Sequence, residues 1–295
     1  MLRKLVNSFF SESKSIPIRE KAAMTFLEVD LSNLDLSNNY YDQIYNSEID
    51  GLIVKNALSQ FDIDVLKPEK IEQYGVLKEG SDFGYVIGRT LNGCAELDLD
   101  HSYFDETDRM RGYLDELFST DYVFFLEQIL SRLCGKRKVA LPRNANGRLY
   151  KPSTVRVLQQ NTSNGMPPHI GQEFLSLPQL SDLSNQADVN SQLSFFFMLQ
   201  PPDVGGELEV YDLVWNDTPK ELVGGMNVIE KKKERENLLM DKDSKRLALE
   251  KGDLLLFDGG RIWHQVRPVL GQTNRVTIGG FTALSKNHRK VFYWH

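Results

Sequence analysis

The chain has few cysteines and no long apolar run, and both absences restrict its class. Cys94 and Cys134 are the two cysteines, and their separation fits neither a disulfide framework nor a zinc site. No stretch approaches the roughly 18 apolar residues of a membrane span. The chain has a basic start, but Asn7 and Ser8 interrupt the apolar part of this segment, and no small-residue cleavage pattern follows. We therefore expect a cytoplasmic protein with no membrane partner.

An excess of basic residues is also absent. The chain has 35 Lys and Arg against 41 Asp and Glu, a net charge of -6, which gives it no electrostatic reason to bind nucleic acid. A hydrophobic content of 41% over 295 residues is enough for a buried core. Because neither an internal repeat nor a Pro/Gly/Ser linker divides the sequence, we expect a single domain over residues 1–295.

The segment from Glu106 to Cys134 carries the clearest helical pattern. Its apolar residues recur at intervals of three and four, which predicts helices. The run Ser119-Thr120-Asp121 is expected to divide two helices, and Gly135 to end the second. We expect both helices to pack against a sheet, within a helical N-terminal part over residues 1–150.

After Pro152 the pattern changes to short β-branched and aromatic runs separated by turns, which predicts antiparallel strands. The expected strands are 154–158, 192–199, 207–215, 253–257, 262–269 and 276–282. Short strands without intervening helices are typical of a sandwich, barrel or jelly roll. Within this core, residues 151–295, the charged segment 216–245 is expected to be either a solvated insertion or a lid over the barrel mouth.

The chain has five histidines, and their surroundings differ. His101, His288 and His295 lie in polar or loop-like stretches, where we expect solvated or capping side chains. His169 and His264 lie in the β region beside turn residues, so these two are the candidates for chemistry.

The strand after His264 carries Arg275 and Thr277, which share a face because strand side chains alternate with period two. These three side chains can therefore point into one barrel interior. Burying an unpaired guanidinium is unfavourable, so an inward Arg275 predicts a carboxylate from the protein or from a ligand. A surface arginine is the alternative.

The residue two after His169 is unusual for an iron site. A facial site for ferrous iron takes two histidines and a carboxylate, which normally follows the first histidine by two residues. Here Gly171 occupies that position. Glycine leaves a coordination position and space for an exogenous anion, and chloride or bromide would replace the missing negative charge. Two alternatives stay open: a degenerate site that binds no metal, or Glu173 folding back as the ligand.

These residues resemble the iron(II)/2-oxoglutarate halogenases that act on free cyanobacterial indole alkaloids of the hapalindole and welwitindolinone type. The resemblance extends from about residue 150 to the end of the chain. It is much weaker before residue 150. It rests on His169–Phe174, Gln192–Phe196, Gly205–Leu208 with Val210-Tyr211 and Trp215-Asn216, Gly252–Arg261, Thr277–Phe281 and Tyr293-Trp294. It implies a mainly β fold with N-terminal helices, an α+β protein built on a cupin-like double-stranded β-helix, or jelly roll.

The resemblance also implies roles for individual residues. His169 and His264 would bind Fe(II), Gly171 would mark the halide position, and Arg275 with Thr277 would bind 2-oxoglutarate. The implied reaction is radical halogenation, above all chlorination, of an unactivated aliphatic carbon, with dioxygen as cosubstrate. Its substrate would be a free small-molecule natural product such as an indole alkaloid, with no carrier protein.

Three further residues are candidates around this site. Ser194 is a lone hydroxyl in an apolar strand, placed to fix an oxygen near the metal through a hydrogen bond; a bond to the backbone is its alternative. Ile170 and Phe174 are candidate apolar walls for the substrate, or ordinary core. The alternative functions are a hydroxylase on the same scaffold and a metal-free β-barrel binding protein, and a polar substrate such as a nucleoside or an amino acid is the alternative ligand.

Overall fold

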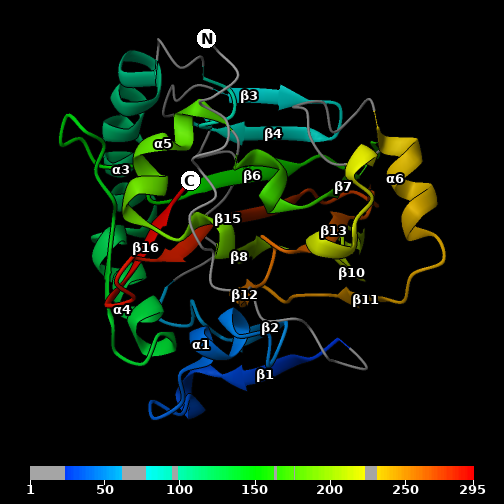
Figure 1. The fold of residues 1–295 in the computed structure, drawn as a ribbon, viewed down its shortest axis with the longest axis horizontal. Helices are drawn as coiled ribbons and strands as arrows, with labels where there is room; N and C mark the ends of the chain where they lie inside the picture. The colour runs from blue at the N-terminus through cyan, green and yellow to red at the C-terminus, as the bar shows by residue number, and fades with distance from the viewer. Residues whose placement is uncertain (1–23, 62–77, 95–98, 163–164, 176, 223–230) are drawn as a thin grey trace, which may run out of the picture.

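The computed structural model describes residues 24–61, 78–94, 99–162, 165–175, 177–222 and 231–295. Two β-sheets face each other, with helices packed outside the larger one (Figure 1). An apolar cluster lies between the sheets and draws on both, from Leu255 and Met198 of the larger sheet to Val210 and Val266 of the smaller one. This is the layered arrangement of a jelly roll.

The larger sheet runs in the order β1 (Phe26–Asp30), β2 (Gly51–Lys55), β12 (Leu254–Phe257), β8 (Leu193–Gln200), β15 (Arg275–Leu284), β6 (Thr154–Leu158), β4 (Gly84–Ile87) and β3 (Lys78–Ser81). β16 (Lys290–Trp294) pairs with β15, and β5 (Lys138–Ala140) with β16. The smaller sheet runs β11 (Ser244–Leu247), β10 (Leu208–Val214), β13 (Ile262–Val266) and β7 (Met166–His169). β9 (Val204–Gly205) pairs with β14 (Val269–Leu270). β1–β2 and β5–β16 are parallel pairs in an otherwise antiparallel arrangement of the described strands.

The period-two pattern of the sequence decides which side chains face the site. In β8, Phe195 and Phe197 pack in the cluster that includes the helices, whereas Ser194 and Phe196 line an internal cavity. In β15, Val276 and Ile278 likewise join the helix-side cluster, while Arg275 and Thr277 face inward. Successive side chains of a strand point to opposite faces, so the same strands build both the outer core and the site.

Two long helices cover the outer face of the larger sheet. α3 (Asp105–Phe118) and α4 (Tyr122–Leu133) flank the predicted break, where Ser119 has a φ of 51° and the Asp121 side chain accepts a hydrogen bond from the Phe124 N–H. Gly135, with a φ of 61°, follows the end of α4. The two predicted helices and their boundaries are confirmed. Shorter helices are α1 (Tyr40–Tyr45), α5 (Ser181–Gln186) and α6 (Lys232–Leu239).

The expectation of a helical N-terminal part is incomplete. Strands β1 to β5 all lie before residue 150, and β1 to β4 extend the larger sheet at its two edges. β2 joins it through an antiparallel ladder with β12, and β4 through one with β6. These segments are too short for their residue pattern to distinguish a strand from a loop. Their pairing with strands distant in the sequence stabilises them.

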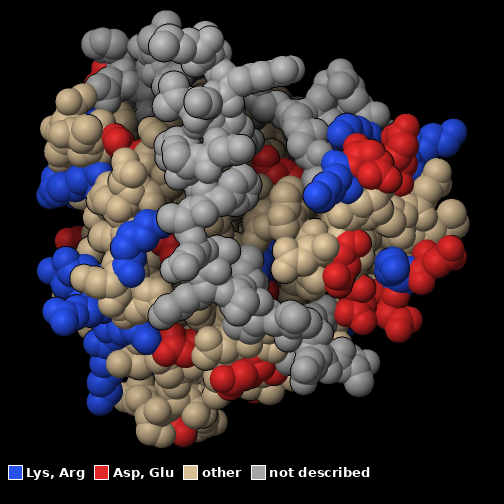
Figure 2. Space-filling model, viewed as in Figure 1, with Lys and Arg blue, Asp and Glu red and all other residues tan. Residues whose placement is uncertain are grey.

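The charged segment is partly buried rather than fully solvated. Figure 2 shows acidic and basic side chains side by side over α6, yet Arg235 is 0% exposed and Leu239 is 2% exposed. Leu239 packs with Trp263 of β13 in a small apolar cluster. Residues 223–230, in the middle of this segment, lie outside the described part of the chain. No helix among the described residues is both long and apolar enough to cross a membrane.

Candidate active site

His169 and His264 meet on adjacent strands of the smaller sheet. β7 and β13 pair antiparallel with these two residues directly opposite each other, and their ring centroids are 4.2 Å apart. Both side chains are buried, and both line the two internal cavities described below. The strand pairing therefore brings together the two predicted iron ligands, 95 positions apart by their numbers.

Each imidazole uses one ring nitrogen for its own strand. Nδ1 of His169 lies 2.9 Å from the Pro167 carbonyl oxygen, and Nδ1 of His264 lies 2.9 Å from the Ile262 carbonyl oxygen. A carbonyl only accepts, so Nδ1 carries the proton and Nε2 keeps its lone pair. Burial lowers the pKa of His264 to about 4, and burial together with the neighbouring His264 lowers that of His169. Both rings are neutral near pH 7, which is the form that binds metals.

Gly171 begins a 3-10 turn, Gly171–Phe174, packed against the turn between β12 and β13. Its N–H donates to the Gly259 carbonyl at 2.9 Å, and the Gln172 N–H donates to the Gly260 carbonyl at 3.0 Å. These two hydrogen bonds fasten the turns to each other. A Cβ added to Gly171 would lie 2.8 Å from Nε2 of Gln192 and 3.0 Å from Cα of Gly260. Glycine therefore allows the close approach of the two turns, in addition to leaving no carboxylate beside the histidines.

Glu173, the alternative carboxylate ligand, has another partner. Its Oε1 and Oε2 lie 2.6 and 3.1 Å from Nη2 and Nη1 of Arg235 on α6, and both side chains are almost fully buried. Burial raises the pKa of Glu173 to about 7, and the charge of Arg235 opposes that rise. The Glu173 side chain lines neither internal cavity. The structure thus directs this carboxylate toward the insertion and away from the histidines.

A small cavity of about 130 Å³ lies between the two sheets and contains Arg275 and Thr277. Arg275 is 3% exposed, has no hydrogen-bond or ion-pair partner among the described residues, and lies 5.1 Å from the Phe196 ring centroid. Burial, reinforced by Arg156, lowers its pKa to about 9. The predicted inward Arg275–Thr277 face is confirmed, and its unneutralised cation creates a site for an anion.

Arg156 on β6 is a second cation at this cavity. It lies opposite Thr277 in the β6–β15 ladder, and burial lowers its pKa to about 10. No described residue forms an ion pair with it. Arg156 lines both internal cavities, whereas Arg275 lines only the smaller one. Two unpaired arginines favour a ligand that carries more than one negative charge, such as a dicarboxylate.

A larger cavity of about 390 Å³ opens beside the histidines. Most of the exposed area of its wall is apolar, and polar side chains such as Asn92, Gln192 and Arg156 also line it. Its lining includes Phe83, Tyr85, Val86, Leu91, Phe174, Leu180, Phe281 and Trp294. Ser194 lines both cavities.

The candidate wall residues have different outcomes. Phe174 lines the larger cavity, as expected. Ile170 does not: it is 0% exposed and packs with Leu213, Leu239 and Trp263 on the other side of the smaller sheet. The assignment of Ile170 to the substrate wall is wrong, because alternation along the chain turns it away from the side that His169 faces.

Comparison with known proteins decides the family. Residues 23–295 match the family described as the carrier-protein-independent halogenase WelO5. The chain belongs to this family. The match includes the N-terminal half, where the family resemblance of the sequence is weak. No curated protein matches the chain.

Solved structures resemble this one in fold. An N-substituted L-amino acid dioxygenase from Burkholderia ambifaria AMMD is 14% identical with a TM-score of 0.54, and the match covers 85% of this chain and 89% of that chain. The same enzyme in complex with alpha-KG is 13% identical with a TM-score of 0.51, over 85% of this chain and 89% of that one. The predicted mainly β jelly-roll fold is confirmed. Membership of the family places the chain among iron(II)/2-oxoglutarate-dependent enzymes, whereas the solved structures show the fold alone.

The nitrogen donors that this chain offers at the site fit an iron ion. Two neutral imidazoles present free Nε2 atoms from opposed strand positions, beside a pocket with two arginines that no described residue neutralises. Among the described residues, no group of three or more His, Cys, Asp or Glu side chains could hold a metal ion. Of the described residues, His169 and His264 are the ones that would hold iron.

Several site residues escaped sequence reasoning. Arg156 left a signal, since a charge stands in the middle of the apolar strand Thr154–Leu158. His295 was expected to be solvated, but it lines both cavities, and its ring stacks 5.7 Å from that of Phe281. Its Nδ1 is buried without a hydrogen-bond partner in the described part of the chain. Its position depends on the pairing of β15 with β16, and no pattern in the neighbouring sequence predicts that pairing.

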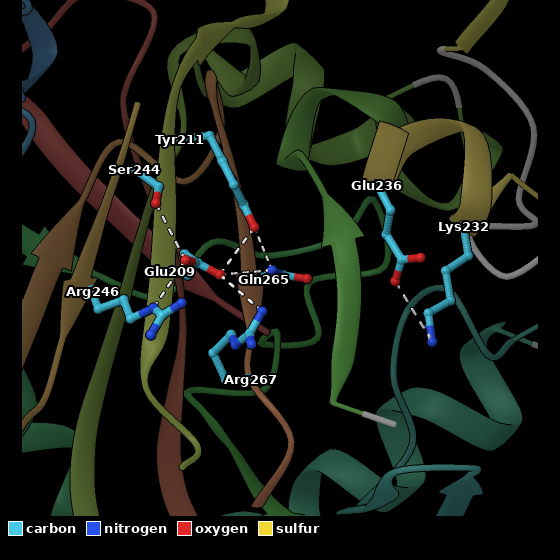
Figure 3. Close-up of polar contacts among 8 residues, drawn as sticks. All are labelled: Glu209, Tyr211, Lys232, Glu236, Ser244, Arg246, Gln265 and Arg267. Carbon is cyan, nitrogen blue, oxygen red and sulfur yellow. Dashed lines mark hydrogen bonds and ion pairs between the residues drawn. The ribbon is translucent and has the colours of Figure 1, made fainter. Parts of the chain in front are cut away.

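A polar network supports β13 on the face opposite His264 (Figure 3). Glu209 of β10 accepts hydrogen bonds from Gln265 at 2.8 Å, Tyr211 at 3.0 Å and Arg246 at 3.0 Å. Burial alone would raise the pKa of Glu209, but these hydrogen bonds outweigh it and lower the pKa. The network joins β10, β11 and β13, so it stabilises the strand that carries the second histidine.

Proposed function

We propose that the protein is an iron(II)/2-oxoglutarate-dependent radical halogenase. It chlorinates, or brominates, an unactivated aliphatic carbon of a free small-molecule natural product of the polycyclic indole-alkaloid type. Its cosubstrate is dioxygen, and no carrier protein takes part. The observation that carries this proposal is the pairing of His169 with His264 beside Gly171, with the nearby Glu173 carboxylate held by Arg235.

The residues have separate roles in this proposal. His169 and His264 hold iron through Nε2, and Arg275 with Thr277 binds the distal carboxylate of 2-oxoglutarate in the smaller cavity. When bound, iron supplies the oxidation chemistry and a coordination position for halide. Because a radical on the substrate would combine with whichever group is nearer, positioning decides between halogenation and hydroxylation.

Substrate position is set by the larger cavity. Its apolar wall suits a hydrocarbon-rich molecule, and its volume of about 390 Å³ is in the range of small-ligand sites. We assign to Ser194, which lines both cavities, a hydrogen bond that favours halogenation over hydroxylation. The aromatic and aliphatic part of this wall suits a polycyclic hydrocarbon skeleton better than the polar groups of a nucleoside or an amino acid.

Anaerobic loading with Fe(II) and 2-oxoglutarate, followed by oxygen and chloride, tests the proposal with candidate alkaloids. Succinate and a chlorinated product are expected, with bromide giving the brominated one. A rate of succinate formation that does not depend on halide, with hydroxylated product alone, would support a hydroxylase. Failure to retain iron even with 2-oxoglutarate would support a metal-free binding protein.

Substitution of Gly171 tests the halide position. We expect Gly171→Asp to abolish chlorination and to gain hydroxylation, because its carboxylate takes the place of the halide. The added Cβ also crowds Gln192 and Gly260, so Gly171→Ala is the matched control for crowding. Chlorination that survives in Gly171→Asp would contradict the assignment of this position.

A further inference from the structure

Arg235 joins the charged insertion to both strands of the histidine pair. Besides Glu173, its guanidinium donates to the Pro168 carbonyl at 3.2 Å, immediately before His169. It also lies 5.3 Å from the ring centroid of Trp263, immediately before His264. A fully buried cation on a surface helix is uncommon. Its contacts show that α6 is anchored at the metal-binding strands.

The two-pronged ion pair engages both oxygens of Glu173. This residue lies in the same 3-10 turn as Gly171, and its carboxylate is the acidic group nearest to Gly171 in the sequence. A buried carboxylate without a countercharge is strongly disfavoured. If Arg235 were absent, the countercharges left to Glu173 would be Lys231 and a metal cation held by the histidines.

Packing alone does not require this ion pair. Apolar residues of similar size often replace a buried pair without loss of stability, whereas removal of one partner leaves an uncompensated charge. The pair does, however, determine where the Glu173 carboxylate points, and that direction is away from both cavities.

We propose that Arg235 is a specificity-determining positioning residue, which holds the Glu173 carboxylate against α6 and so keeps the coordination position beside Gly171 open to halide. This inference rests on the proposed function. It assigns to the insertion a part in the choice of ligand through Arg235, a residue that lines neither cavity.

Chloride binding measures this effect directly, without turnover. The protein is loaded anaerobically with Fe(II) and 2-oxoglutarate at a series of pH values from about 7 to about 9, because burial raises the pKa of Glu173 and loss of the Arg235 charge would raise it further. Chloride is then titrated while the visible absorption of the iron complex and the electron paramagnetic resonance of its nitric oxide adduct are recorded. Iron content and thermal unfolding are measured on the same samples.

We expect Arg235→Met to weaken chloride binding by about tenfold or more while iron is retained, because the freed carboxylate competes for the same position. In the double variant Arg235→Met with Glu173→Gln, no competing carboxylate remains, and chloride affinity should return to within about threefold of the unmodified protein. Unchanged chloride affinity in Arg235→Met would overturn the proposal. So would a double variant as impaired as Arg235→Met, since Arg235 would then act only by supporting the turn.

Arg137→Met is the matched control. Arg137 forms a two-pronged ion pair with Asp42, with both distances 2.7 Å, outside the walls of the two cavities. Its loss should lower thermal stability and leave chloride affinity unchanged. An equal loss of chloride affinity in this control would show that the effect of Arg235 is general destabilisation, and would overturn the proposal.

Two further outcomes keep the proposal testable. If Arg235→Met does not fold, Arg235→Gln replaces it, since a neutral amide keeps a hydrogen-bond donor but removes the countercharge of Glu173; unchanged chloride affinity there would overturn the inference. If the unmodified protein binds iron but does not respond to chloride, the proposed function fails together with the inference. If it responds, and Arg235→Met responds equally, only the inference fails.

Discussion

Replacement of Arg275 by methionine should weaken 2-oxoglutarate binding and, at the same time, stabilise the ligand-free protein. The side chain is a buried cation with no acceptor among the described residues, and methionine keeps much of its volume. The two effects have opposite signs because the charge is unfavourable until an anion arrives. A purely structural arginine would lose stability on the same substitution.

The magnitudes follow from the surroundings of Arg275. Burial lowers its pKa to about 9, below the ordinary value, so the ionised side chain destabilises the folded state at every pH below about 9. At about 1.4 kcal/mol for each pKa unit, this amounts to roughly 5 kcal/mol. Loss of the contact with Phe196 offsets about 1–2 kcal/mol of the gain. A net gain of roughly 3 kcal/mol should raise Tm by about 6 °C.

Binding should change in the other direction. A hydrogen bond to a charged group contributes roughly 1.5–3 kcal/mol, so loss of a two-pronged contact weakens 2-oxoglutarate binding by about 100-fold or more. Calorimetric titration of the Fe(II) protein under anaerobic conditions measures this, and thermal unfolding without ligands measures the stability. The control ligand is 2-oxobutyrate, which lacks the distal carboxylate and should bind both proteins alike. A variant that binds 2-oxoglutarate within about threefold of the parent, or loses more than about 2 kcal/mol of stability, would refute the reasoning.

Three other substitutions test neighbouring parts of the site. Arg156→Met should weaken 2-oxoglutarate binding by about tenfold without lowering Tm; calorimetry checks this, and unchanged affinity would contradict it. Ser194→Ala should raise the ratio of hydroxylated to halogenated product by about tenfold, measured by mass spectrometry, through loss of one hydrogen bond; a constant ratio counts against its role. Glu209→Gln should reduce the free energy of unfolding by about 1–2 kcal/mol at neutral pH. Since the pKa of Glu209 is lowered in the fold, this difference should shrink as pH falls through that pKa, as acid titration of unfolding would show.

Much of the candidate site could be anticipated because its signals are local. Alternation along β15 places Arg275 and Thr277 on one face whatever strand pairs with it, and the structure has both in the smaller cavity. The same alternation, carried one residue past His169, would have turned Ile170 away from the cavity, where the structure has it. Arg156 was equally readable, since it stands between Val155 and Val157 in a predicted strand.

Other parts of the site depend on contacts between distant segments. The ion pair of Glu173 with Arg235 joins a turn after β7 to a helix 62 residues later, and each residue alone looks like an ordinary surface charge. The burial of His295 depends likewise on the pairing of β16 with β15. Strands β1 to β4 are short, and their place at the edges of the larger sheet follows from their partners rather than from their own pattern.

The amino-acid sequence by itself determined the helical stripe of α3 and α4, the strand faces, and the glycine two residues after His169, because side-chain periodicity and residue type act over a few residues. Only the tertiary structure decided that His169 lies opposite His264, that two arginines share one pocket without an acceptor among the described residues, and that Glu173 points toward α6. Strand register and long-range ion pairs arise when separate segments bury their apolar faces together, and no single segment contains that information.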